Sequence, residues 1–198
     1  MSPARAGYLA LALLDTGLAA AGRSAARRAS KPLLMPVLAL QRDRPTQRAL
    51  VLSGAGDVAL LGDGDRAFTA GLASFLAAHL AWVSALRGRP GGGRLGRRPA
   101  LAVPYAVAWA ALNAYLWPRT GRDRLPVLVY STALAATALA ALDTDDPRAV
   151  AGGALFMASD TLLALHRFAG VELPAHEGWV MGTYTSAQAL LAAGGSTR

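Results

Sequence analysis

Apolar residues gather in eight runs, and short charged or glycine-containing segments separate each run from the next. A membrane-spanning helix needs about 20 mostly apolar residues, and most of these runs supply them. The pattern predicts an all-α, polytopic membrane helix bundle with about eight transmembrane helices, or seven as the alternative, in a single integral membrane domain over residues 1–198. The runs cover residues 6–22, 32–41, 49–62, 67–86, 99–117, 125–142, 149–166 and 178–194.

The second and third runs, 32–41 and 49–62, are short for a membrane span. A helix rises about 1.5 Å per residue, so neither run alone covers a hydrocarbon core of about 30 Å. We therefore expect these two helices to borrow flanking residues, or to pack against protein rather than against lipid.

The amino-acid composition also favours a membrane protein. Hydrophobic residues make up 54% of the chain, charged residues 16%, and the mean hydropathy is +0.33. A soluble domain of 198 residues has too little interior for that much apolar surface, so a soluble enzyme, a coiled coil and a disordered chain are disfavoured. The chain has no cysteine, which excludes disulfides, thiolate metal sites and cysteine nucleophiles.

The net charge of +8 comes from 20 Lys and Arg against 12 Asp and Glu. Most basic residues lie between apolar runs, where they face anionic lipid headgroups, so no nucleic-acid partner is expected. With the N-terminus inside, eleven of the 20 basic residues fall on the inner side, which predicts a protein of the cell (plasma) membrane with both termini in the cytoplasm. These residues are Arg5, Arg42, Arg44, Arg48, Arg87, Arg89, Arg94, Arg97, Arg98, Arg148 and Arg198.

Two aspartates lie inside apolar runs in similar local sequences. Asp57 follows Gly56, Asp160 follows Ser159, and leucines come soon after each. Small residues let helices approach closely, so we expect both carboxylates to face a shared interior. An ionisable residue at membrane depth is costly and marks a candidate functional site. The alternative, that a carboxylate only bonds a neighbouring helix, is the better interpretation for Asp15.

Further hydrogen-bonding side chains lie within the apolar runs. His79 falls on an apolar stripe at helical spacing, Tyr184 and Gln188 lie one turn apart, and Tyr130 lies in the run 125–142. These groups suit a polar cavity, although hydrogen bonds between helices explain them about equally well. No metal-ligand spacing such as HExxH is present, so neither a metal nor another cofactor is expected.

Short motifs that run in order through nearly the whole chain carry a family resemblance. They are Ser30-Lys31-Pro32, Gly56-Asp57 with Leu60-Leu61, Phe68 through His79, Pro126 with Tyr130, Gly153 through Asp160, and Tyr184 with Gln188. Together they resemble the lysoplasmalogenases, the YhhN-like small multi-pass membrane proteins. Two positions depart from the family pattern: Thr137 stands where a methionine is frequent, and the aromatic residue after His79 comes only at Trp82.

The resemblance implies a membrane hydrolase of lipid metabolism. Its substrate would be a lysophospholipid in the bilayer, a lysoplasmalogen, whose vinyl-ether bond is cleaved to a fatty aldehyde and a glycerophospho-choline or glycerophospho-ethanolamine. Such hydrolysis begins with proton transfer to the alkene carbon, so it needs one protonated carboxyl group and one carboxylate that stabilises the cation and activates water. Two aspartates close together in a low-dielectric cavity divide these roles. Ionising both costs too much free energy, so one stays protonated and the other is a carboxylate.

Asp57 and Asp160 are therefore the predicted catalytic pair. Lys31 or an interfacial arginine is expected to hold the substrate phosphate. The residues expected to support catalysis or to bind substrate are His79, Lys31, Tyr184, Gln188, Tyr130 and Ser159.

A small proton-coupled transporter that uses the same aspartates is the alternative. Asp57 and Asp160 fall in the third and seventh runs, as in a duplicated four-helix unit. A transporter of this kind should have broken helices at matching positions of both halves. The segment with Pro32 and Pro36 has no counterpart in the run 125–142, so the hydrolase is favoured.

Overall fold

The computed structural model describes residues 3–40, 42–89 and 91–194, which form helices and turns and contain no strand. Each apolar run becomes one long helix, because a helix satisfies its backbone hydrogen bonds within its own segment. The long helices are α1 (Pro3–Ala20), α2 (Ser24–Ala39), α3 (Arg44–Ala59), α4 (Gly64–Arg87), α6 (Val103–Leu116), α7 (Arg124–Asp143), α8 (Pro147–Ala169) and α9 (His176–Ala192). Short turns of helix complete the described part: α5 (Arg94–Arg97), η1 (Pro99–Ala102) and η2 (Gly121–Asp123).

Local sequence signals set several helix ends. The Asp43 carboxylate accepts the backbone N–H of Thr46 at 2.9 Å and caps α3, and the Asp146 carboxylate does the same for Arg148 at the start of α8. Helix α8 ends at Gly170, whose φ of +65° suits glycine. These caps place α3 and α8, which carry Asp57 and Asp160.

Helix α2 differs most from its predicted run. It begins at Ser24, eight residues before the run 32–41, whose last position lies outside the described residues. The added turns carry Arg27 and Ser30, which are buried against the rest of the bundle. Pro32 and Pro36 lie inside the helix, so α2 continues although each proline removes one backbone hydrogen bond.

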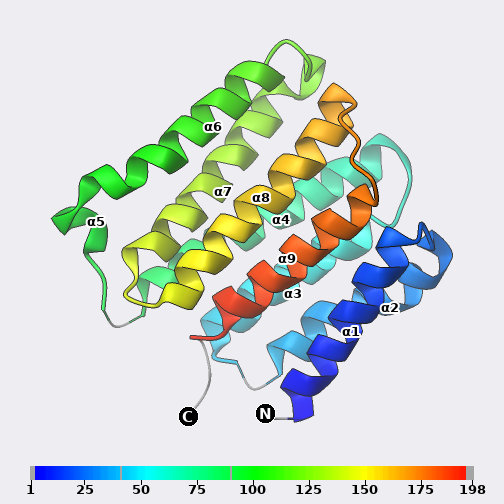
Figure 1. The fold of residues 1–198 in the computed structure, drawn as a ribbon, viewed down its shortest axis with the longest axis horizontal. Helices are drawn as coiled ribbons and strands as arrows, with labels where there is room; N and C mark the ends of the chain where they lie inside the picture. The colour runs from blue at the N-terminus through cyan, green and yellow to red at the C-terminus, as the bar shows by residue number, and fades with distance from the viewer. Residues whose placement is uncertain (1–2, 41, 90, 195–198) are drawn as a thin grey trace.

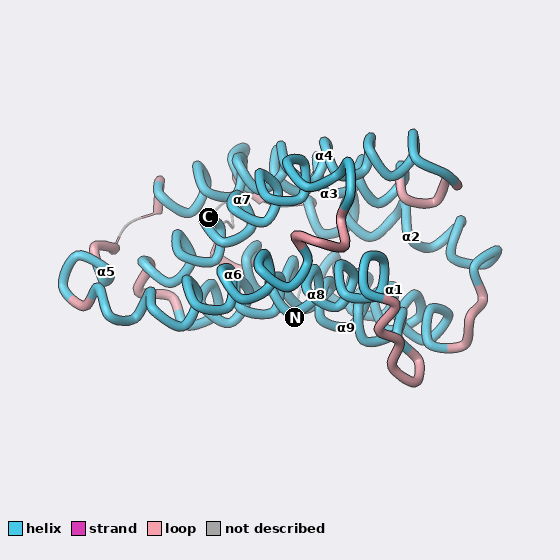
Figure 2. Tube along the Cα trace, turned by 90° about the horizontal axis from the view of Figure 1, so that it is seen from above, coloured by secondary structure: helices cyan, strands magenta, loops and turns pink. Residues whose placement is uncertain are grey.

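Seven of the long helices close into a ring, in which each packs against the next in the order α1, α2, α3, α4, α7, α8 and α9, and α9 returns to α1. Figure 2 shows that the ring is flattened, with α3 and α4 in one layer and α8, α9 and α1 in the other. Helix α6 lies outside the ring against α7 and α8 (Figure 1), and Leu116 is its one buried residue. The ring interior is therefore the place where side chains from many helices meet.

Four helical segments are long and apolar enough to cross a membrane: Gly64–Arg87, Pro99–Leu116, Gly121–Asp143 and Pro147–Ala169. Helices α2 and α3 carry polar and charged residues that point into the ring, which lowers their apolar content. The protein is thus an all-helical bundle with four candidate spans among the described residues, and the expected count of about eight spans stays a prediction.

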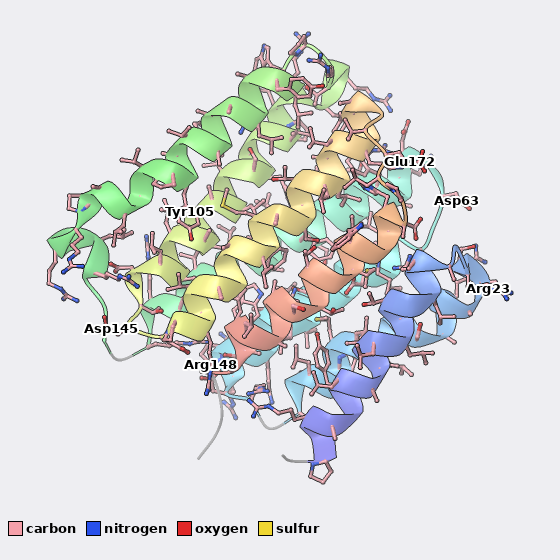
Figure 3. The ribbon with its side chains drawn as sticks, viewed as in Figure 1. Arg23, Asp63, Tyr105, Asp145, Arg148 and Glu172 are labelled. Carbon is pink, nitrogen blue, oxygen red and sulfur yellow. The ribbon has the colours of Figure 1, made fainter. Side chains whose placement is uncertain are left out.

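Charged connections lie at two opposite ends of the bundle. Asp145 and Arg148 mark one end, here the Asp145 end, and Arg23, Asp63 and Glu172 mark the other, here the Glu172 end (Figure 3). Because successive long helices are antiparallel, the arginines assigned to the cytoplasm lie at the Asp145 end, apart from Arg198, which lies outside the described residues. The side of the membrane that this end faces stays a prediction.

Candidate active site

Asp160 lies on the inner face of α8 and is held by two aromatic side chains. The Tyr130 hydroxyl, from α7, donates a hydrogen bond to Oδ2 of Asp160 at 2.5 Å. Nε2 of His79, from α4, lies 3.7 Å from the same oxygen. Within the described residues, Oδ1 of Asp160 makes no hydrogen bond or ion pair, and the side chain is 11% exposed. One carboxylate oxygen is therefore fixed and the other is free to meet a ligand.

His79 is fully buried, and both ring nitrogens have partners. Nδ1 lies 3.1 Å from Oγ1 of Thr137, and Nε2 lies 3.3 Å from the Tyr130 hydroxyl. The Thr137 hydroxyl lies 3.0 Å from the carbonyl of Ala133, to which it donates, so its oxygen is left to accept a hydrogen bond from Nδ1. This arrangement turns Nε2 towards Asp160.

Asp57 lies in a second cluster, formed by α2, α3 and α9. The Tyr184 hydroxyl donates to Oδ2 of Asp57 at 2.7 Å, and Nζ of Lys31 lies 3.4 Å from Oδ1. The Asp57 side chain is 2% exposed and that of Lys31 is 11% exposed, so this is a buried ion pair. Lys31 thus faces the carboxylate and not a lipid interface.

Aromatic rings connect the two clusters. The Phe156 ring lies 4.6 Å from His79 and 5.7 Å from Tyr184, measured between ring centroids. Phe75 meets Tyr184 edge-on at 5.9 Å. Among the described residues, Asp57 and Asp160 have no hydrogen-bond or ion-pair partner in common, so each carboxylate has its own surroundings inside one apolar interior.

The remaining predicted residues lie on the facing sides of α8 and α9. Gln188 is fully buried one turn from Tyr184, and neither atom of its amide makes a hydrogen bond of ordinary geometry within the described part of the chain. The Ser159 hydroxyl donates to the carbonyl of Val180 at 3.0 Å and so ties α8 to α9. Gln188 therefore faces the Asp57 cluster with unused hydrogen-bonding capacity, whereas Ser159 uses its hydroxyl in helix packing.

A small apolar pocket, with a cavity volume of about 60 Å³, lies beside Asp160 on the side of the Glu172 end. Asp160 and Tyr130 are polar residues in its wall, and Arg167 is the charged residue of α8 nearest that end. Its mostly apolar lining suits the hydrocarbon part of a ligand near Asp160. Its apolar walls include Leu60, Phe68, Leu72, Phe75, Val127 and Leu163.

Three of these residues were not among the site residues predicted from the sequence. Thr137 was notable only as a departure from the family pattern, and Phe156 only as part of a motif, yet both contact His79. Arg167 is seven residues after Asp160, a spacing that places both on one face of α8. That spacing is the signal that identifies Arg167. No group of three or more His, Asp or Glu side chains in the described ranges is placed to hold a metal ion.

Comparison with known proteins agrees with the motifs. A model of the YhhN family matches residues 24–195. Relatives named lysoplasmalogenase, from Mycobacterium bovis and Mycobacterium tuberculosis, are each 37% identical over 157 residues, which is 74% of this chain. The chain spans 58% of the length of these relatives, and no solved structure matches it significantly. The family match includes Lys31, Asp57, His79, Tyr130, Asp160 and Tyr184, and the chain belongs to the YhhN family.

Proposed function

We propose that this protein is a membrane hydrolase that cleaves the vinyl-ether bond of lysoplasmalogens. The observation that carries the proposal is the apolar pocket that ends at Asp160 between Tyr130 and His79. The relatives named lysoplasmalogenase support the same reaction. The apolar helices suit a protein of the cell membrane, where a lysophospholipid reaches the pocket from the bilayer.

The reaction begins with a proton transfer that the Asp160 cluster is built to make. A proton moves from a carboxyl group to the alkene carbon remote from the ether oxygen, and an oxygen lone pair forms the oxocarbenium ion. Water adds to the cationic carbon and gives up a proton to a carboxylate. The hemiacetal hydroxyl then loses its proton, the bond between its carbon and the glycerol oxygen breaks, and that oxygen takes up a proton. The products are a fatty aldehyde and a glycerophospho-choline or glycerophospho-ethanolamine.

We assign the proton transfer to Asp160 because it is the candidate carboxyl group in the pocket wall. Tyr130 holds Oδ2, so Oδ1 is the atom that exchanges the proton. His79 positions this carboxyl group, with its Nε2 at 3.7 Å from Oδ2. Asp57 is the second carboxylate of the proposed pair, and it lies on the other side of Phe156 in its own cluster with Lys31 and Tyr184.

The test compares two substrates that differ by one double bond. The purified protein in detergent is expected to release a long-chain aldehyde from a 1-alkenyl lysophospholipid and none from the saturated 1-alkyl analogue, because only the alkene accepts the proton. A diacyl phospholipid serves as the second control. Equal turnover of the saturated ether would contradict the vinyl-ether mechanism.

A further inference from the structure

Arg167 lies at the outer part of the pocket that ends at Asp160. It is in the last turn of α8, and its guanidinium carbon lies 3.8 Å from the ring centroid of Phe68 on α4. Phe168 packs edge-on against the same Phe68 ring at 6.1 Å. The aromatic contact orients the guanidinium group along the pocket wall without using its N–H donors.

Arg167 has no acidic partner among the described residues, whereas two other arginines at the Glu172 end do. Arg27 pairs with Glu177 at 2.5 Å, and Arg122 pairs with Asp65. In the described ranges no carboxylate lies within ion-pair distance of Arg167. Its guanidinium group makes cation–π contacts with the rings of Phe68 and Phe168. Its planar fork is therefore available to bind the oxygens of a phosphate in a bidentate manner.

The spacing of Arg167 and Asp160 matches the length of the substrate. Seven residues of helix separate their backbones by about 10 Å on one face of α8. In a lysoplasmalogen, seven covalent bonds separate the alkene carbon that accepts the proton from the phosphorus atom, which is about 8 Å when extended. One molecule therefore reaches both side chains, with its phosphate at Arg167 and its alkene at Asp160.

We infer that Arg167 is the residue that binds the substrate phosphate at the pocket mouth. The inference rests on the proposed function and names the headgroup contact of that same site. It moves this role from Lys31, which faces Asp57 inside the ring, to an arginine on the helix that carries Asp160.

A binding experiment tests this assignment without requiring catalysis. The probes are a saturated 1-alkyl lysophospholipid and the matching 1-alkylglycerol, which lacks the phosphate, titrated against the protein in detergent by calorimetry. Arg167→Gln is expected to weaken binding of the phosphate probe by about tenfold, since a charge-assisted bidentate contact is lost. Binding of the alkylglycerol should stay as in the wild type.

Arg119 provides a matched control. Its guanidinium carbon lies 3.9 Å from the ring centroid of Tyr115, almost the geometry of Arg167 over Phe68, but outside the pocket. Arg119→Gln is expected to bind both probes as the wild type does. Arg167→Lys keeps a charge without the fork and should give intermediate affinity for the phosphate probe, which keeps the test decisive if Arg167→Gln does not fold.

A competition experiment distinguishes a lipid phosphate from free inorganic phosphate as the ligand of Arg167. An excess of inorganic phosphate should displace the lysophospholipid probe poorly, because it lacks the hydrocarbon that the pocket walls contact. Strong displacement by inorganic phosphate would assign Arg167 to a soluble anion and overturn the inference.

The same variants separate this inference from the proposed reaction. In the aldehyde-release assay, Arg167→Gln should raise KM for the phosphate-bearing substrate while kcat is largely kept. Unchanged binding of the phosphate probe by Arg167→Gln, or an equal loss in Arg119→Gln, would overturn the role of Arg167 and leave hydrolysis intact. If binding of the phosphate probe depends on Arg167 but the wild-type protein releases no aldehyde, the hydrolase is contradicted and the phosphate site is supported.

Discussion

Lys31 and Asp57 form a buried ion pair between α2 and α3, with Nζ of Lys31 3.4 Å from Oδ1 of Asp57. The residue before Lys31 contacts another buried carboxylate, since the Ser30 hydroxyl donates a hydrogen bond to Asp15 at 2.6 Å. Adjacent residues of α2 thus contact two buried aspartates on two different helices. The contact with Asp15 explains why Ser30 is buried although the first turns of α2 are largely exposed.

Breaking the Lys31–Asp57 pair should destabilise the protein more than removing both charges. Lys31→Met leaves a buried carboxylate without its cation and is expected to lower the free energy of unfolding by about 3 kcal/mol. The double variant Lys31→Met with Asp57→Asn should recover much of that loss. Thermal unfolding of the three purified proteins in the same detergent measures the coupling, and additive effects would argue against an ion pair.

Substitutions in the Asp160 cluster should reduce activity most at the residue that donates the proton to the alkene, and less at residues that only contact it. Asp160→Asn removes the proton donor and is expected to lower kcat by at least about 100-fold, while Tyr130→Phe, which only releases Oδ2, should lower it less. Asp15→Asn is the matched control, because Asp15 is also a buried aspartate, and its polar partners in the described part of the chain are Ser30 and Arg27, outside the pocket. Near-normal turnover by Asp160→Asn at wild-type expression would contradict the assignment.

The two proposed catalytic aspartates should not act independently. If Asp57 and Asp160 form one functional unit, the double Asn variant is expected to be little slower than the slower single variant. Steady-state aldehyde release by the four proteins checks this. If the losses of activity in the two single variants instead multiply in the double variant, Asp57 has a separate, structural role with Lys31. A proton-coupled transporter would have no aldehyde-forming activity to lose.

Close helix contacts predict which glycines tolerate a methyl group. A Cβ at Gly152 would lie 2.9 Å from the backbone nitrogen of Leu191 and 3.0 Å from the carbonyl oxygen of Ala187, so α8 and α9 must separate. Gly152→Ala should destabilise the protein by about 1–3 kcal/mol. Gly17→Ala on α1, with nothing within 4 Å of the new methyl group, should be neutral or slightly stabilising. Equal melting temperatures for the two variants would contradict this packing.

Membrane orientation is testable by labelling because the chain has no cysteine. Asp145→Cys and Glu172→Cys introduce single thiols at opposite ends of the bundle (Figure 3). In intact bacterial cells, a membrane-impermeant maleimide is expected to label Glu172→Cys only, since the arginine-rich Asp145 end is predicted to be cytoplasmic. Labelling of Asp145→Cys alone would reverse the orientation, and labelling of both would contradict a spanning bundle.

Local sequence patterns were enough to predict the long helices and to single out the two candidate aspartates. Eight apolar runs give eight long helices because each helix satisfies its own backbone and needs no distant partner. Asp57 and Asp160 stood out for an equally local reason, since a carboxylate inside an apolar run is costly wherever its helix packs. The start of α2 was missed because Arg27 and Ser30 look solvent-exposed until their partners on α1 and α9 are known.

Which side chains contact one another depends on how the helices pack, and this could not be read from the sequence. Thr137 contacts His79 across 58 residues of sequence, and Tyr184 contacts Asp57 across 127. These pairings depend on the order of the helices in the ring and on the rotation of each about its axis, and no local pattern records either. For the same reason Lys31, expected at a phosphate, faces Asp57, and Arg167 acquires its place at the pocket only when α8 packs across the ring from Phe68 of α4.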